Sequence, residues 1–107
     1  MIEIFRYVHE NGQEPFTKWL SSLRDNVAQA RIRVRIRQIE SGNFGDCEVI
    51  GEGVSELRVH VGAGYRIYFG RHGKAVVLLL MGGDKRTQQA DIKQAKKCWA
   101  EWKRSQK

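Results

Sequence analysis

The polar side chains of residues 53–71, GVSELRVHVGAGYRIYFGR, are predicted to share one face of a β-hairpin. Successive side chains of a strand point to opposite faces, and here hydrophobic residues alternate with polar ones. Guanidinium groups donate charged hydrogen bonds to phosphate, and a neutral imidazole accepts a proton. The face therefore carries groups that suit a phosphate ligand. Its polar members are Glu56, Arg58, His60, Arg66 and Tyr68.

The register of this hairpin follows from keeping apolar residues opposite apolar residues. A two-residue loop would mix the faces, whereas the three-residue loop 62–64 (GAG) keeps them separate and places a glycine where a left-handed conformation is needed. Directly opposed residues have Cβ atoms about 4.5–5.5 Å apart. The predicted pairs are Val61–Tyr65, Val59–Ile67, Leu57–Phe69, His60–Arg66 and Arg58–Tyr68.

This register clusters two arginines, an imidazole and a phenol. Neighbouring arginines favour the neutral form of His60, which can then accept a proton. By a similar register Leu78 of the next strand lies near Arg66, so the cluster is expected in a partly covered groove. The segment GGDKRTQ brings Lys85 and Arg86 to the same edge. The alternative is a solvated polar face without a ligand.

Hydrophobic periodicity predicts the elements that position this face. Residues 2–8 alternate as a strand, and Pro15 begins a helix whose apolar side chains recur at helical spacing. Asp25 or Asn26 caps a second helix that runs to about Ser41. Within it RIRVRIR alternates as a strand would, but the length of the segment and the helical spacing of Ala28, Ile32, Ile36 and Ile39 favour a helix.

The second half of the chain reads as three further strands and a helix. A short edge strand near residues 48–50 precedes the hairpin, and the apolar run 74–81 predicts a buried strand. Asp84 is a candidate cap for a basic final helix, in which Trp99 and Trp102 are expected to pack on the sheet. The order β-α-α-(β)-β-β-β-α predicts an α+β fold with an antiparallel meander, forming a single domain over residues 1–107.

Composition narrows the class of protein. The chain has 107 residues and a net charge of +7, which favours polyanions such as nucleic acid, or an acidic protein partner. The N-terminus does not resemble a signal peptide, so a cytoplasmic protein that does not associate with membranes is expected. Cys47 and Cys98 are expected to be reduced thiols. No metal-ligand spacing is present, and no metal or other cofactor is expected.

Several motifs together resemble the RelE/ParE superfamily of bacterial toxins. They are ELR, then GYRIYF, then an apolar strand, then GGDKRTQQADIKQAKK, and the resemblance covers nearly the whole chain. It is greatest for the HigB-like branch, also called addiction-module killer proteins. The resemblance implies a RelE-like α+β fold and the toxin of a type II toxin-antitoxin system, which a cognate antitoxin neutralises.

The resemblance also implies an activity. RelE-like and HigB-like toxins are metal-independent endoribonucleases, or mRNA interferases, that cut mRNA on the ribosome and inhibit translation. Carried over position by position, it makes Arg58, Arg66 and Lys85 candidate catalytic residues, and Arg86 shares the basic pair with Lys85. His60 joins this catalytic group as a candidate for proton transfer. Tyr68 and Lys93 join Arg86 as candidate RNA contacts.

Two other functions compete with the ribonuclease. The ParE branch shares the fold but poisons DNA gyrase, and a degenerate member would only bind RNA or its antitoxin. The basic groove and the KRTQ segment favour the ribonuclease. Two antitoxin docking surfaces are open at this stage, namely the face of Arg58 and Arg66, or the final helix with Trp99 and Trp102.

Overall fold

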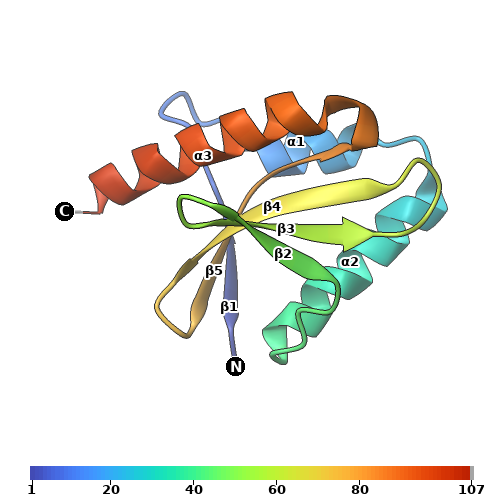
Figure 1. Ribbon diagram of the computed structural model, residues 1–107, viewed down its shortest axis with the longest axis horizontal. Coiled ribbons are helices and arrows are strands. Elements are labelled where there is room, and N and C mark those ends of the chain that lie inside the picture. Colours follow the sequence, from blue (N-terminus) through green and yellow to red (C-terminus); the bar gives the residue numbers. More distant parts are fainter. Residues whose placement is uncertain (107) are drawn as a thin grey trace.

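A single five-stranded mixed sheet organises the computed structural model, which describes residues 1–106. The strands lie in the order β1-β5-β4-β3-β2 (Figure 1). The elements are β1 (Glu3–Arg6), α1 (Pro15–Ser22), α2 (Asn26–Glu40), β2 (Cys47–Gly51), β3 (Val54–Val59), β4 (Tyr65–His72), β5 (Val76–Asp84), the 3₁₀ helix η1 (Lys85–Thr87) and α3 (Gln88–Ser105).

The α+β class is confirmed, with two additions to the expected layout. The strands β2 to β5 form the predicted antiparallel meander, but β1 joins the same sheet in parallel beside β5. The 3₁₀ helix η1 stands between β5 and α3, so Asp84 caps η1 by accepting a hydrogen bond from the backbone of Arg86. No helix in residues 1–106 is long and apolar enough to cross a membrane.

Local signals in the sequence set the first two helices. Pro15 opens α1, where a missing N–H costs nothing. Asp25 caps α2 by accepting a hydrogen bond from the backbone N–H of Ala28 at 3.0 Å. Ala28, Ile32 and Ile39 are buried in α2, which confirms the helical reading of RIRVRIR over the strand reading. The alternation there is incidental, because the burial follows a helical period.

The sheet is covered on both faces, which divides the core into two clusters. The helices α1 and α2 pack on one face, where Phe16, Leu20 and Ile32 meet Leu57 and Ile67. The helix α3 crosses the other face (Figure 1). The second cluster contains Tyr7, Val54, Tyr68, Leu78, Leu80, Ala95, Cys98 and Trp99.

Small residues allow helices to approach the sheet closely. A Cβ atom at Gly70 would collide with the indole of Trp99, and one at Gly82 would collide with that of Trp19. Trp99 is only 4% exposed, which confirms its predicted place in the core. The thiols of Cys47 and Cys98 are both unpaired, the first exposed and the second buried.

The predicted hairpin register is wrong by two residues. Val59 pairs with Tyr65, and Arg58 pairs with Arg66, so the loop spans residues 60–64. The backbone N–H of Gly64 donates to the carbonyl of Val61 at 3.0 Å, which closes a turn within that loop. A shift of two keeps every side chain on its predicted face, and the hydrophobic pattern therefore could not distinguish the two registers.

The corrected register changes the neighbours of the polar residues. His60 lies in the loop and not opposite Arg66, and Tyr68 faces Glu56 instead of Arg58. On β5 the residue opposite Arg66 is Gly83, whereas Leu78 pairs with Gly70 farther along the strand. The polar cluster must therefore be described from its observed contacts.

Candidate functional site

Two arginines lie directly opposite each other on β3 and β4, on the face that α3 covers. Arg58 and Arg66 are paired residues, and their side chains are 28% and 15% exposed. Two guanidinium groups on opposed positions repel each other, which destabilises a sheet. A buried carboxylate, Glu56, compensates this repulsion: it is 1% exposed and lies two residues before Arg58 on the same face.

Both carboxylate oxygens of Glu56 accept hydrogen bonds. Its Oε1 atom accepts from Nε of Arg58 at 3.3 Å and from Nη1 of Arg66 at 3.1 Å. Its Oε2 atom accepts from the side-chain amide of Gln88, the first residue of α3, at 3.0 Å. Buried charges persist where they are paired and hydrogen-bonded. We call Glu56, Arg58, Arg66 and Gln88 the arginine cluster.

Arg58 is surrounded by carboxylates. Besides Glu56 it forms ion pairs with Asp46, at 3.5 Å, and with Glu48. These two partners are 42% and 63% exposed, and therefore lie at the rim of the cluster. Arg35 of α2 fixes this rim, because its guanidinium donates to the backbone carbonyls of Arg58 and Asp46, among others. The charge of Arg58 is thus largely balanced within the protein.

The guanidinium of Arg66 has hydrogen-bond donors that the described part of the protein does not use. Within residues 1–106 only its Nη1 atom has a hydrogen-bond partner, which is Glu56. Its remaining guanidinium N–H groups have no protein acceptor in this part of the chain, although the side chain is partly buried. A guanidinium held by one edge and open on the other presents a ready donor pair to an anion.

His60 is tied to the cluster only through a neighbour. Its Nε2 atom forms a hydrogen bond with the carboxylate of Asp46, which in turn pairs with Arg58. The hydrogen bond with His60 and the nearby charge of Arg58 hold the pKa of the Asp46 carboxyl below its usual value. The structure thus places His60 at the rim, 69% exposed, with an acid beside it.

Tyr68 lies beneath the cluster and has no exposed surface. Burial, together with the neighbouring Glu56 carboxylate, raises the pKa of its hydroxyl above the usual value. A side chain closed off by α3 cannot stack on a base, so the expected role of Tyr68 in contacting RNA does not fit its position. It forms part of the packed floor under Glu56 instead.

The other predicted basic residues lie around the start of α3. Lys85 is exposed, and its aliphatic part lies against Gly64 in the loop before Arg66. Arg86 is exposed and forms an ion pair with Asp84 at 2.9 Å. Lys93 is exposed on α3, and in residues 1–106 the hydrogen bonds of the arginine cluster do not include it. The fold therefore brings Lys85 near the cluster but leaves Lys93 apart.

Sequence reasoning missed the acidic half of this site. It placed Glu56 on the polar face without assigning it a function, and it gave Gln88, Asp46 and Glu48 no part. The signal was present in ELR, because residues two apart on a strand share a face and a Glu beside an Arg there forms a pair. Among residues 1–106 no three His, Cys, Asp or Glu side chains gather as a candidate metal site.

A second carboxylate lies near the cluster, at the start of α3. Asp91 accepts a hydrogen bond from the hydroxyl of Thr87 at 2.5 Å and packs so closely on β5 that a Cβ atom at Gly83 would strike it. Burial raises the pKa of the Asp91 carboxyl. Ionisation of Asp91 therefore opposes folding, and the free energy of unfolding falls as pH rises from the unfolded pKa through the higher folded pKa.

We expect Asp91→Asn to stabilise the protein at pH 7. An amide keeps an oxygen acceptor for Thr87 and removes the cost of the charge. The gain should disappear below about pH 4, where aspartate is protonated in both states. Thermal melting of both proteins from pH 3 to pH 8 measures it, with exposed Glu52 changed to Gln as the control. Equal melting temperatures at every pH would contradict the prediction.

Comparison with known proteins places this chain in a family. Residues 18–102 match the family described as phage derived protein Gp49-like (DUF891). The chain belongs to the Gp49-like family. This family is part of the RelE-like toxin superfamily of toxin-antitoxin systems, which confirms the broad resemblance and implies a cognate antitoxin. The HigB branch itself is not singled out by the match.

A relative occurs in Haemophilus influenzae (strain ATCC 51907 / DSM 11121 / KW20 / Rd). This chain is 48% identical to an uncharacterized protein of that bacterium over 81 residues, which cover 76% of this chain and 82% of the relative. The name of this relative adds no activity.

Proposed function

We propose that this Gp49-like protein is the toxin of a type II toxin-antitoxin pair and an endoribonuclease that cuts mRNA on the ribosome. The observation that carries this proposal is the arginine cluster. A partly buried guanidinium, that of Arg66, is fixed by Glu56 along one edge and keeps open donors on the other. Two arginines placed opposite each other destabilise a sheet. A bound phosphodiester would offset their repulsion, and this accounts for the arrangement.

The chemistry requires charge stabilisation more than it requires a strong nucleophile. A ribose 2′-hydroxyl attacks the adjacent phosphorus and loses its proton, while the bond from phosphorus to the 5′-oxygen breaks and that oxygen gains a proton. The products are a 2′,3′-cyclic phosphate and a 5′-hydroxyl. Negative charge grows on the phosphate oxygens in the transition state, where Arg66 and Lys85 would stabilise it.

Arg58 enters this scheme by exchanging partners. Its contacts with Asp46 and Glu48 are surface ion pairs at partly exposed groups, and such pairs contribute about 0–1 kcal/mol. A phosphate oxygen can replace either carboxylate while Glu56 still holds Nε of Arg58. The Asp46–His60 pair at the same rim is the candidate for moving the proton of the 2′-hydroxyl.

The end groups of the RNA products test this function. The purified chain is added to a translation reaction programmed with a defined message, and the fragments are sequenced and treated with phosphatase. We expect cleaved message with cyclic or 2′/3′ phosphates and 5′-hydroxyls, because attack by the ribose leaves those ends. Fragments with 3′-hydroxyls would reject the proposed reaction, and intact message with gyrase-linked DNA breaks would favour a gyrase poison.

Treatment of the purified toxin with EDTA tests whether the reaction needs a metal ion. Since the proposed reaction uses only side chains, toxin that has been treated with EDTA and then dialysed should cut as fast as untreated toxin when the ribosomes keep their own Mg²⁺. A loss that one added transition metal restores would contradict a metal-independent reaction.

A further inference from the structure

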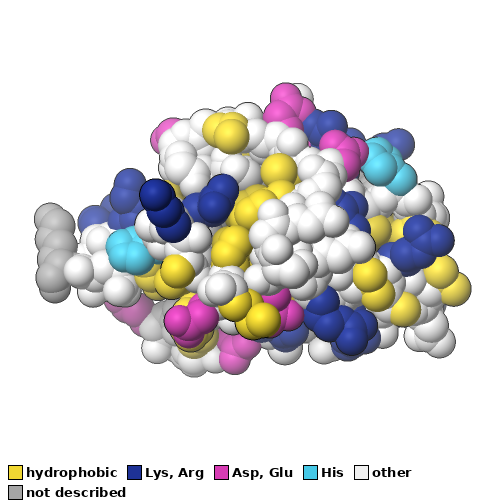
Figure 2. Space-filling view, turned by 90° about the horizontal axis from the view of Figure 1, so that it is seen from below, with side chains coloured by type: hydrophobic (Ala, Val, Ile, Leu, Met, Phe, Trp, Pro, Cys, Tyr) yellow, Lys and Arg dark blue, Asp and Glu magenta, His cyan; other side chains and the backbone are white. Residues whose placement is uncertain are grey.

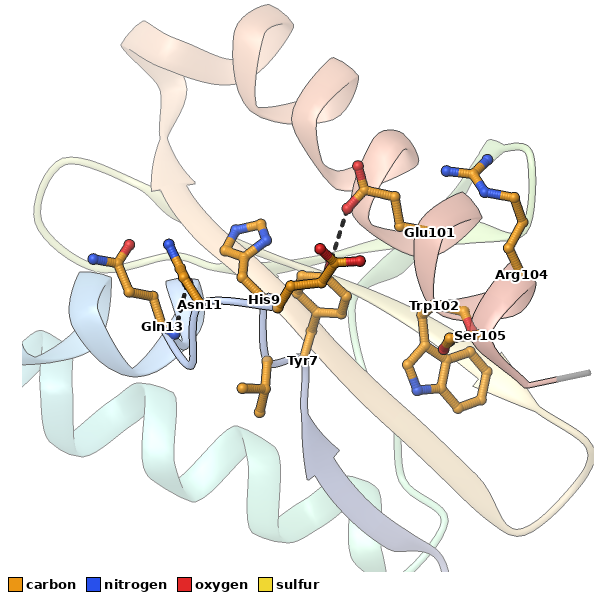
Figure 3. A pocket seen from close by; sticks show the side chains of 10 residues that line it. Tyr7, His9, Asn11, Gln13, Glu101, Trp102, Arg104 and Ser105 are labelled. Atoms are coloured by element: carbon orange, nitrogen blue, oxygen red, sulfur yellow. Dashed lines mark hydrogen bonds between the residues drawn. The ribbon is translucent and has the colours of Figure 1, made fainter.

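Two adjoining cavities lie at the end of the molecule remote from the arginine cluster. A cleft of about 840 Å³ is bordered by Tyr7, His9 and Glu10 on one side and by Glu101 and Trp102 of α3 on the other. Figure 3 shows the side chains of the N-terminal segment and of α3 facing each other across this cleft. It continues into an apolar groove of about 410 Å³. The groove is lined by Phe5, Arg6, Tyr7, Val8, Val76, Leu78 and Trp102.

Large hydrophobic side chains are left uncovered beside this groove. Phe5 is 49% exposed and Val8 is 51% exposed. Trp102 is partly exposed, stacks on Trp99 with ring centroids 5.1 Å apart, and meets His72 edge-on. Figure 2 shows hydrophobic side chains along the surface near the C-terminal end, with Lys and Arg side chains gathered beside them. Contiguous exposed apolar surface of this kind marks binding sites.

The strand next to the groove has an open edge. β1 is the last strand of the sheet on its side, and three of its four residues are exposed. The backbone N–H groups of Glu3 and Tyr7 donate to carbonyls on the β5 side, at 2.7 and 2.9 Å. Since alternate residues point their N–H groups to opposite edges, those of Ile4 and Arg6 face outward. Such an edge can pair with a further strand.

Charge identifies the chemistry of the partner. Arg104 lines the cleft, and Arg6 borders the groove but turns its guanidinium to the α1 side of the sheet, where it donates to the Thr17 hydroxyl at 2.9 Å and lies over the Phe16 ring. Neither arginine has a carboxylate partner within residues 1–106. The carboxylate of Glu101 already accepts a hydrogen bond from the Tyr7 hydroxyl at 2.9 Å. An incoming strand whose acidic residues point to both faces of the sheet would therefore pair with Arg104 on the α3 side and with Arg6 on the α1 side, in keeping with the net charge of +7.

We propose that an extended, acidic segment of the antitoxin adds to the open edge of β1 and inserts an apolar side chain into the Phe5–Trp102 groove. This inference rests on the toxin assignment, and it names the docking surface of the partner. Main-chain hydrogen bonds to Ile4 and Arg6 supply affinity, and the groove supplies specificity for the anchor. Trp102, not Trp99, is the aromatic contact, because Trp99 is in the core.

The bound segment leaves the arginine cluster uncovered. β1 pairs with Val76–Leu79 of β5, whereas Arg66 lies opposite Gly83, four residues beyond Leu79. That is a separation of about 13 Å along the strand, with β5 also lying between β1 and β4. An antitoxin docked at β1 therefore inhibits the toxin by its size, which keeps the toxin from its substrate, and not by occupying the phosphate site.

Two substitutions at one position isolate the backbone contact. Arg6→Pro removes the outward N–H without touching the bonds between β1 and β5, whereas Arg6→Ala keeps the N–H and removes the same side chain. The probe is the purified protein encoded beside the toxin gene, titrated calorimetrically into each full-length variant. We expect Arg6→Pro to bind at least about 10-fold more weakly than Arg6→Ala, and Phe5→Asp about 30-fold more weakly than wild type.

Hydrogen exchange of the wild-type complex gives an independent readout. The amides of Ile4 and Arg6 should become protected on binding. Equal affinities for Arg6→Pro and Arg6→Ala, protection only elsewhere, or no binding of the adjacent gene product would overturn the proposal. Should Arg6→Pro melt early, Phe5→Asp decides, because its side chain is half exposed. Analytical ultracentrifugation tests the remaining occupant. If the free chain sediments as a dimer and Phe5→Asp makes it a monomer, the open edge of β1 binds a second copy of this chain instead.

RNA cleavage by the free variants separates this inference from the proposed function. Arg6→Pro and Phe5→Asp should cut as fast as wild type, because they lie far from the arginine cluster. If the wild-type chain cuts no message but Arg6→Pro still weakens the complex, the proposed nuclease activity is wrong and the docking surface is supported. Normal cleavage with unaltered binding of both variants would defeat only the docking surface.

Discussion

Replacing Arg66 with alanine is expected to lower the rate of RNA cleavage by about 10²–10³, the usual effect of removing one positioned donor from a developing negative charge. Arg66 is the cation whose guanidinium has open donors, and it is held in place by Glu56. Single-turnover cleavage of a defined message by purified protein measures the rate. In cells the same variant should no longer arrest growth at matched expression.

Two controls separate the charge of Arg66 from its contribution to folding. Arg33→Ala removes an exposed arginine from α2, on the opposite side of the sheet, and should cut normally. In Arg66→Ala, Glu56 keeps its bonds from Arg58 and Gln88, so we expect a loss of stability of only about 1–3 kcal/mol. A folded Arg66→Ala protein that cuts at the wild-type rate would reject the phosphate site.

The fold was largely predictable because its signals are local. Pro15 and Asp25 mark helix starts in the sequence, and both helices begin there. Burial at Ala28, Ile32 and Ile39 follows the spacing that favoured a helix over RIRVRIR. The parallel pairing of β1 with β5 joins residues more than seventy positions apart. No local pattern specifies such a contact, and it was not predicted.

The site was predictable in its faces but not in its contacts. Alternation assigned Arg58 and Arg66 to the same side of the sheet, and the structure places them there. Their actual pairing depends on the loop, where Gly62 and Gly64 adopt positive φ angles of 55° and 78° and turn the chain over five residues. Two-residue periodicity cannot detect a shift of two, and so His60 was placed opposite Arg66.

Burial of charge was the other property that the sequence concealed. Glu56 lies between Ser55 and Leu57 and reads as one more exposed polar group of a strand, yet it is 1% exposed. It is buried because α3, from the far end of the chain, crosses this face and brings Gln88 to its second oxygen. The arginines then remain partly buried because Glu56 balances them, which makes this carboxylate the structural centre of the site.

Removing Glu56 is therefore expected to have the largest effect on stability of any change in the cluster. Glu56→Ala leaves Arg58 and Arg66 opposed and unbalanced, and breaking a buried ion pair in this way typically costs about 3–5 kcal/mol. We expect the lower end, because the two guanidinium groups keep 28% and 15% of their surface exposed. Chemical denaturation of wild type and variant measures the difference.

Glu48→Ala is the matched control, since it also removes a carboxylate partner of Arg58, but one that is 63% exposed. It should cost less than about 1 kcal/mol. If the loss in Glu56→Ala arises from uncompensated arginine charge, then adding Arg66→Ala to that variant should recover part of the lost free energy, even though it removes a further side chain. Equal losses for Glu48→Ala and Glu56→Ala, or strictly additive losses in the double variant, would mean that Glu56 does not hold the arginines together. Partial recovery would show that this one carboxylate balances the two cations on which the proposed reaction depends.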